Sequence, residues 1–288
     1  MHVPPSTIPQ RSHESREDIC MSRIITTRLR TCAGVGALLG LGAQVVPHAD
    51  TTAQSRVSGV SVLVYHRVMP VVTNEMTLRP STLQWQLDYL KEHHYPIVPL
   101  RTVVAYLLGK APAPAPSSVV ITIDDGHRSV YTDMLPLLRR LGAPVTLFIY
   151  PSAVSNASYA LTWQQIAELQ RTRLFTIESH TYWHPNFKVE HRRLGADAYR
   201  EFATRQLCRS RSVLEQRVGE APSLLAWPFG VYENEAIEIA RKCGYTAAFT
   251  LGARGVIAGT DLMTLPRFLV TDKAVGKAFA AMLPPEPR

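Results

Sequence analysis

The feature that most constrains the fold is a regular alternation of short apolar runs with amphipathic segments from residue 57 onward. The runs are rich in Val, Ile, Leu and aromatic residues, as buried strands are, and lie at 60–65, 119–124, 143–150, 174–180, 223–230, 245–251 and 261–270. The segments between and after them have helical spacing, at 81–94, 101–110, 129–142, 162–170, 198–219, 233–244 and 271–283. This alternation predicts an α/β fold with a mostly parallel sheet, and a barrel rather than an open sheet.

The first 56 residues have the features of a leader and are excluded from the predicted fold. Three arginines after Met21 precede an apolar stretch at 33–46, which small polar residues follow; this is the order of a secretory signal peptide. The residues before Met21 are typical of a mis-annotated start or a disordered tail. We therefore expect export to the periplasm or secretion. An uncleaved membrane anchor is only the second choice, because the apolar stretch is short for a bilayer core of about 30 Å.

Composition excludes several classes for the remaining part, residues 57–288, which we expect to form one domain. The net charge of the full chain is +8, but the arginines are scattered rather than interleaved with aromatics, which argues against nucleic-acid binding. No glycine-rich phosphate loop follows a predicted strand, which argues against a sugar-nucleotide enzyme. Cys208 and Cys243 form no Cys/His zinc cluster, and whether they pair stays open.

Two groups of polar residues directly follow predicted strands, where active sites of parallel α/β folds lie. Asp124 and Asp125 follow the run VVIT-Ile, and His180 and His184 follow LFTIES. Adjacent carboxylates are costly to bury without a cation, and two imidazoles four positions apart can reach one ion. Asp-Asp-Gly is also good turn chemistry, and either histidine alone is also an ordinary packed residue. Together they predict a metal site with coordination positions open for water and substrate.

A third group, Trp227-Pro228-Phe229-Gly230, ends another predicted strand. Proline and glycine fix a turn there, and its backbone amides could point into the same cavity. A plain turn explains this fragment equally well.

The segments ITIDDG, SHTYWH and WPFG, in this order and with these separations, resemble the first three motifs of the NodB-type polysaccharide deacetylases, carbohydrate esterase family four. The segments VLVYHRV, DDGHRSVYTDMLP and LPRFLV make the chain especially similar to the branch that deacetylates poly-β-1,6-N-acetylglucosamine in biofilm matrices. The resemblance covers most of residues 57–272 and implies a distorted (β/α)7 barrel. It also implies that 57–288 is the catalytic domain of a hydrolase that removes N-acetyl groups from a β-linked N-acetylglucosamine polysaccharide. A polymer synthesis or export machine as partner stays open.

The same resemblance implies a role for each motif residue. Asp124 corresponds to the general base, and Asp125, His180 and His184 correspond to the metal ligands. The expected ion is Zn²⁺, although related enzymes often accept Co²⁺ or Ni²⁺. The backbone amide of Phe229, where the family usually has Tyr, would help to hold the tetrahedral oxyanion.

Two departures from the family concern this catalytic set. Many members carry an arginine that orients the base shortly before the Pro-x-Gly turn, where this chain has Leu-Ala-Trp. The late Leu-x-x-His motif, the source of the general acid, has no match, because no histidine follows His191. His66, at the end of the first predicted strand, and His127 are the candidate acids. His66 has the better position, with a packed histidine as the alternative.

Aromatic residues beside the motifs could stack on sugar rings: Tyr65, Tyr182, Trp183 and Trp227, with Pro228 adjacent. Aromatics at strand ends are also ordinary barrel core. Two alternative functions remain for this site, because groove shape rather than the metal ligands selects the glycan. One is a peptidoglycan or chitin-oligomer deacetylase, and the other is a non-catalytic polysaccharide-binding protein of the same fold.

Overall fold

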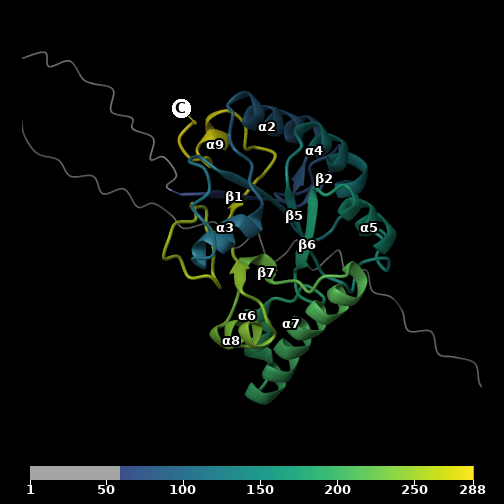
Figure 1. Ribbon diagram of the computed structural model, residues 1–288. Coiled ribbons are helices and arrows are strands. Elements are labelled where there is room, and N and C mark those ends of the chain that lie inside the picture. Colours follow the sequence, from purple (N-terminus) through teal and green to yellow (C-terminus); the bar gives the residue numbers. More distant parts are fainter. Residues whose placement is uncertain (1–58, 288) are drawn as a thin grey trace, which may run out of the picture. The chain divides into compact units, whose positions relative to one another are not determined.

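The computed structural model describes residues 59–287, which belong to one structural unit. Its centre is a seven-stranded sheet in the order β8-β7-β6-β5-β4-β1-β9, with every neighbouring pair parallel (Figure 1). The strands are β1 (Ser61–Tyr65), β4 (Val119–Ile123), β5 (Val145–Ile149), β6 (Phe175–Ser179), β7 (Leu224–Ala226), β8 (Ala247–Phe249) and β9 (Phe268–Leu269). Each lies within a predicted strand segment. The predicted leader, residues 1–56, lies outside the described residues.

The segment that contains β9 bonds to two strands and curls the sheet. The Leu265 amide donates to the Ala248 carbonyl (2.9 Å), and the Thr250 amide donates to the Leu265 carbonyl (2.8 Å). Further along, the Val270 amide donates to the Val64 carbonyl in β1 (3.0 Å). One stretch of chain therefore pairs with β8 at its start and with β1 at its end. The expected distorted (β/α)7 barrel is confirmed.

Helices connect the strands, as the alternation predicts (Figure 1). They are α2 (Pro80–Glu92), α3 (Leu100–Leu107), η1 (Val130–Met134), α4 (Leu135–Leu141), α5 (Trp163–Arg171), α6 (Phe187–Arg193), α7 (Ala196–Val218), η2 (Pro228–Gly230), α8 (Asn234–Lys242) and α9 (Lys277–Ala280). A small parallel sheet, β2 (Arg67–Val68) with β3 (Thr77–Leu78), lies between β1 and α2 in the chain. Over residues 59–287, none of the helices combines the length and the apolar character needed to span a membrane.

Two helices differ from the prediction for local reasons. Helix α9 is shorter than the segment predicted at 271–283, because Gly276 has φ 53° and ψ −130°, which breaks the helical path before Lys277. Helix α6 was not predicted. The Asn186 side chain starts it by accepting a hydrogen bond from the Val189 amide, which satisfies one of the free amides of its first turn.

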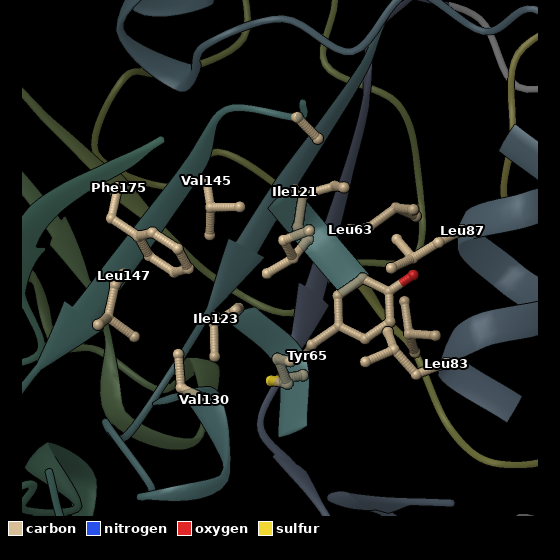
Figure 2. Close-up of a cluster of buried hydrophobic side chains, with 14 of the residues drawn as sticks. Leu63, Tyr65, Leu83, Leu87, Ile121, Ile123, Val130, Val145, Leu147 and Phe175 are labelled. Atoms are coloured by element: carbon tan, nitrogen blue, oxygen red, sulfur yellow. The ribbon is translucent and has the colours of Figure 1, made fainter. Parts of the chain in front are cut away.

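The five-residue strands are buried on both faces, because side chains alternate across a strand and both sides of this sheet are covered. On one side Ile121 and Val145 lie in a cluster that Leu83 of α2 covers (Figure 2). On the other side alternate residues such as Val120 form a second cluster. Tyr65 is 1% exposed and lies in the first cluster, so it is a core residue and not the sugar contact that was expected.

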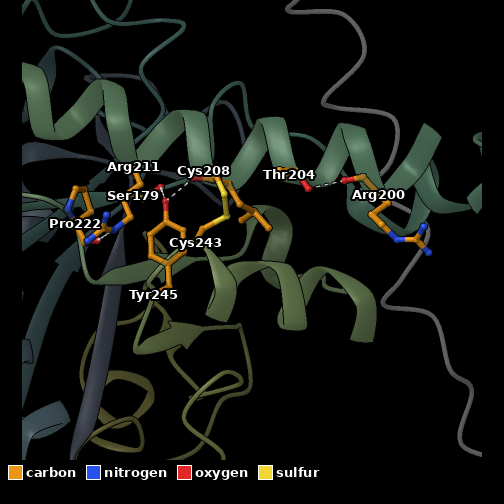
Figure 3. Close-up of a disulfide and its surroundings, with 9 residues drawn as sticks. Ser179, Arg200, Thr204, Cys208, Arg211, Pro222, Cys243 and Tyr245 are labelled. Atoms are coloured by element: carbon orange, nitrogen blue, oxygen red, sulfur yellow. Dashed lines mark hydrogen bonds between the residues drawn. A yellow bond between two sulfur atoms is a disulfide. The ribbon is translucent and has the colours of Figure 1, made fainter. Parts of the chain in front are cut away.

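A disulfide joins Cys208 in α7 to Cys243 at the end of α8, with the two Cα atoms 5.0 Å apart (Figure 3). The sequence had left this pairing open. A cross-link that closes a loop of 35 residues stabilises a folded chain by about 3–4 kcal/mol if the effect is entropic.

Candidate active site

Four of the predicted site residues come together at the carboxyl end of the sheet. Asp124 and Asp125 follow β4, while His180 and His184 follow β6. Nε2 of His180 lies 3.4 Å from Oδ1 of Asp125 and 3.8 Å from Oδ2 of Asp124. Nε2 of His184 lies 3.5 Å from the same Oδ1 of Asp125. Two segments that are distant in the sequence thus form one cluster.

The turns that carry this cluster contain residues with left-handed backbone. Asp125, Thr181 and His184 have φ of 71°, 67° and 64°. Gly126 follows with φ 71°, and a Cβ there would lie 2.8 Å from Cγ2 of Ile149, so only glycine fits. The Asp-Asp-Gly segment is therefore both a tight turn and part of the polar cluster. The sequence offered a turn and a polar site as alternatives for this segment, and in the structure it is both.

The donor atoms of Asp125, His180 and His184 fit a divalent cation. They lie within 4.8 Å of one another. Oδ1 of Asp125 is buried and lacks a hydrogen-bond partner among residues 59–287, which calls for an explanation such as an ion. Nδ1 of His180 lies 2.8 Å from the Ala226 carbonyl, so this nitrogen carries the proton and Nε2 keeps its lone pair for a metal. One carboxylate and two imidazoles are a common zinc set that leaves positions open.

Burial and charge oppose each other in the cluster. Burial favours a neutral Asp125, but the two neighbouring histidines outweigh it and hold the pKa of Asp125 well below its usual range. Burial, with His180 close by, lowers the pKa of His184 to about 4, so its imidazole is neutral at neutral pH. Burial also favours neutral His180, but the carboxylates of Asp124 and Asp125 outweigh it and raise the pKa of His180. A carboxylate anion beside a neutral imidazole suits a cation.

Arg267, from the segment before β9, holds Asp124. Nη1 donates to Oδ1 (2.8 Å) and Nη2 donates to Oδ2 (2.7 Å), and both side chains are buried. The same guanidinium also donates to Oγ1 of Thr122 and to the Thr250 carbonyl, each at 3.3 Å. Burial alone would raise the pKa of Asp124, but the ion pair with Arg267 outweighs it and keeps that pKa below its ordinary value. An arginine therefore binds Asp124, the expected base. It comes from the segment before β9, whereas in the family it precedes the Pro-x-Gly turn.

His66 follows β1 and is 9% exposed. Its Nδ1 is buried and has no hydrogen-bond partner in the described part of the chain. Burial lowers the pKa of His66, and the charges of Asp125 and Asp124 act in the opposite direction. The other candidate acid, His127, is already engaged: its Nδ1 accepts from the amide of Ser129 (3.2 Å) and lies 2.9 Å from Oγ of that residue. His66 is therefore the better candidate of the two.

Two of the predicted sugar contacts lie in the core. Trp227 is fully buried, donates from Nε1 to the Met263 carbonyl (2.9 Å) and packs edge-on against Phe187 with ring centroids 5.5 Å apart. Pro228 is buried beside it. Neither side chain can touch a sugar from there, so this part of the prediction is corrected: the start of the WPFG segment anchors the turn.

The other predicted contacts lie nearer the surface. Trp183 is 42% exposed, while Tyr182 is partly covered by Arg209, whose guanidinium carbon lies 4.1 Å from the ring centroid. Phe229 has φ 58°, and its ring centroid lies 4.6 Å from that of His184. The Phe229 turn therefore lies next to the polar cluster. A backbone amide must lie there if it is to donate to an oxyanion.

Tyr150 and Arg267 are the site residues that sequence reasoning missed. The Tyr150 ring centroid lies 5.3 Å from that of His184, and its hydroxyl lies 2.8 Å from that of Tyr159. The sequence contains a feature that could have indicated each of these two residues. Tyr150 ends the predicted strand between the two motif strands, and Arg267 is a charged residue inside the apolar run LPRFLV.

The family model "Polysaccharide deacetylase" matches residues 111–248, which include the Asp-Asp pair, both histidines and the WPFG turn. The chain contains a NodB-type polysaccharide deacetylase domain. The family expected from three motifs is thereby confirmed. Domains of this family occur in hydrolases that act on amide bonds.

Known relatives of the deacetylase domain include two curated proteins. The poly-β-1,6-N-acetyl-D-glucosamine N-deacetylase of Escherichia coli (strain K12) is 27% identical over 262 residues, which cover 78% of this chain and 38% of the relative. The protein of the same name from Staphylococcus epidermidis is 26% identical over 194 residues, 66% of each chain. This chain therefore spans less than two thirds of the length of either relative.

The solved structure of IcaB from Ammonifex degensii has the same fold. It superimposes with a TM-score of 0.68 at 26% identity, covering 78% of this chain and 96% of that chain.

Proposed function

We propose that the protein is a metal-dependent N-deacetylase that acts on poly-β-1,6-N-acetylglucosamine. The proposal rests on one observation: Asp125, His180 and His184 form a donor set for one divalent cation. Asp124 lies beside this set and is paired with Arg267. The names of the Escherichia coli and Staphylococcus epidermidis relatives, both poly-β-1,6-N-acetyl-D-glucosamine N-deacetylases, support this substrate. Zn²⁺ is the proposed ion, and Co²⁺ or Ni²⁺ suits the same ligands.

The residues of this chain account for orientation and proton transfer. A divalent cation, when bound, supplies Lewis acidity that polarises the acetyl carbonyl and lowers the pKa of water. Asp124 takes the proton of the attacking water at a carboxylate oxygen that Arg267 keeps in place. The Phe229 amide donates to the carbonyl oxygen as negative charge develops there. His66 gives a proton to the sugar nitrogen as the C–N bond breaks, which leaves a free amine and acetate.

Replacing His66 with Asn is expected to lower kcat for acetate release about 10²-fold, because a positioned acid contributes about 10²–10⁴-fold. The loss should shrink when the substrate is an acetyl ester of nitrophenol, since that leaving group needs no proton. His127→Asn is the matched control, and its loss should be much smaller. An equal loss on both substrates would show that His66 does not act as the acid.

Acetate release in the presence and absence of a chelator tests the proposed function. The wild-type protein should release acetate from poly-β-1,6-N-acetylglucosamine, lose this activity on chelation and regain it with Zn²⁺ or Co²⁺. Mg²⁺ is the control ion and should not restore activity, because it prefers oxygen ligands in octahedral geometry. Activity indifferent to the chelator contradicts the metal mechanism. Glycan binding without turnover under any divalent ion would favour a polysaccharide-binding protein instead.

The same assay on chitin oligomers and peptidoglycan decides between glycans. We expect the 1,6-linked polymer to be deacetylated with the highest kcat/KM. Faster release from either alternative would assign the site to a peptidoglycan or chitin-oligomer deacetylase, since groove shape selects the glycan. Trp183 is the proposed stacking residue, because it is the exposed aromatic beside His184 in the chain.

We also propose that the protein acts outside the cytoplasm, in the periplasm or after secretion. Two observations support this: the Cys208–Cys243 disulfide, which persists in oxidising compartments, and the signal-peptide order of the predicted leader. The acetylated polysaccharide is the proposed partner there.

A further inference from the structure

The turn that carries both candidate histidine ligands is held by helix α7 at two points. The Thr181 carbonyl accepts a hydrogen bond from Oγ of Ser210 (2.9 Å). The Trp183 amide donates to Oε1 of Gln206 (3.1 Å). Gln206 and Ser210 are four positions apart in α7, so they share one face of the helix, and both are buried. The Thr181 amide in turn donates to Oγ of Ser179 (3.2 Å).

Tyr245 adds a third hydroxyl group to these contacts, and Figure 3 shows it pointing toward Ser179. Its hydroxyl donates to Oγ of Ser179 (2.8 Å), which lies 2.8 Å from Oγ of Ser210. With one proton per hydroxyl, donation can run from Tyr245 through Ser179 and Ser210 to the Thr181 carbonyl, and Ser179 is then fully satisfied. The Leu207 carbonyl lies 3.1 Å from the same Tyr245 hydroxyl. These groups are buried, where hydrogen bonds that form a chain strengthen one another.

The disulfide lies beside this hydroxyl chain. Cys208 is in α7, two positions before Ser210, and Cys243 is two positions before Tyr245 (Figure 3). The Tyr245 hydroxyl meets its partners only while the chain after α8 stays against α7. The covalent bond between Cys208 and Cys243 limits how far these two segments can separate.

The histidine turn needs such support because its backbone is strained. Thr181 is β-branched and has a positive φ, and His184 also has a positive φ. Conformations of this kind cost about 1–3 kcal/mol each and persist only where the surroundings enforce them. The His184 amide donates to Oγ1 of Thr181 (3.2 Å), so the position of Thr181 affects the second histidine as well.

We propose that Tyr245 is a positioning residue for the metal centre and that the Cys208–Cys243 disulfide keeps it in place. The inference rests on the proposed metal site and extends it to residues that do not touch the ion. Through Ser179 and Ser210, Tyr245 fixes the Thr181 peptide group and so the directions of the His180 and His184 rings. Loss of the hydroxyl lets the turn relax, and the two imidazoles no longer face Asp125 together.

The affinity with which the protein, first freed of metal, binds added Co²⁺ tests this proposal without reference to catalysis. Tyr245→Phe is expected to bind Co²⁺ about 10–100-fold more weakly than the wild type in a calorimetric or chelator-competition titration, the usual effect of losing an outer-shell partner. Ser210→Ala should show a similar loss, and the double variant should lose less than the sum, because both act through one chain of hydrogen bonds. Circular dichroism checks that each protein is folded.

Tyr199→Phe is the matched control. Tyr199 is a fully buried tyrosine of α7, the helix that carries Ser210, and its hydroxyl has no hydrogen-bond partner within residues 59–287. Its removal should leave Co²⁺ affinity unchanged. An equal loss in Tyr199→Phe and Tyr245→Phe would mean that general packing is responsible, and the inference would be overturned.

The remaining outcomes separate this inference from the proposed function. A wild-type protein that binds no Co²⁺ overturns the metal site itself. If the wild type binds Co²⁺ and Tyr245→Phe binds it equally tightly, only the positioning role is overturned. The Cys208→Ser/Cys243→Ser variant should also bind more weakly than the wild type. Unchanged affinity in that variant overturns the contribution of the disulfide.

Discussion

Asp124→Asn is expected to lower the turnover number for acetate release by about 10²–10⁴-fold, the contribution of a positioned general base. Asparagine keeps the shape of the side chain and one acceptor for the buried Arg267, but it cannot take a proton from water. Since the variant also weakens an ion pair, kcat is measured per folded, metal-loaded molecule. Equilibrium dialysis with Zn²⁺ gives that fraction.

Asp125→Asn is the control for this experiment. Oδ1 of Asp125 lies 3.4 and 3.5 Å from Nε2 of His180 and His184 and is the proposed third ligand, so the substitution should abolish Zn²⁺ binding together with activity. Asp124→Asn should instead retain the ion. If Asp124→Asn turned over substrate at the wild-type rate with Zn²⁺ bound, the base would have to be another residue.

Arg267→Met is expected to lower the free energy of unfolding by about 3–5 kcal/mol, because it leaves a buried carboxylate without its counter-charge. Both side chains of the pair are buried, with 1% and 3% exposed, so solvent cannot replace the lost contacts. Urea denaturation measures the change. The double variant Asp124→Asn/Arg267→Met should regain much of the loss, since it removes the unpaired charge as well.

Arg241→Met is the matched surface control. Arg241 pairs with Glu238 at 2.8 Å, but its side chain is 48% exposed, so its removal should change stability by less than about 1 kcal/mol. A similar loss in Arg241→Met and Arg267→Met would contradict the importance of the buried pair. Full stability of Arg267→Met would do so too.

The parallel sheet could be predicted because its strands are buried on both faces and therefore appear as unbroken apolar runs, as β4 and β5 do. Strand order could not be predicted from such runs. Strand β9 is short and irregular: Pro266 and Arg267 directly precede it, and it pairs with β1 over two residues only. The predicted barrel implies that the last strand lies beside the first, but no local pattern indicates which residues of the two strands pair.

The meeting of Asp125, His180 and His184 in one candidate metal site could be predicted because they lie in two segments that follow apolar runs and have a chemistry that apolar surroundings do not tolerate alone. The role of Arg267 could not, since it depends on β9 lying next to β1 and β1 next to β4. Trp227 was assigned wrongly for a related reason. An aromatic residue at a strand end faces the cleft or the core according to the local turn, and sequence spacing does not distinguish the two.

The place of β1 between β4 and β9 has a consequence for biogenesis. Chains emerge amino end first, so β1 is made long before the segment that carries β9. Until that segment arrives, β1 has one unpaired edge and Asp124 lacks the guanidinium that neutralises it. The same segment that completes the pairing of β1 therefore also brings Arg267 to Asp124, and neither contact can form before that segment has been made.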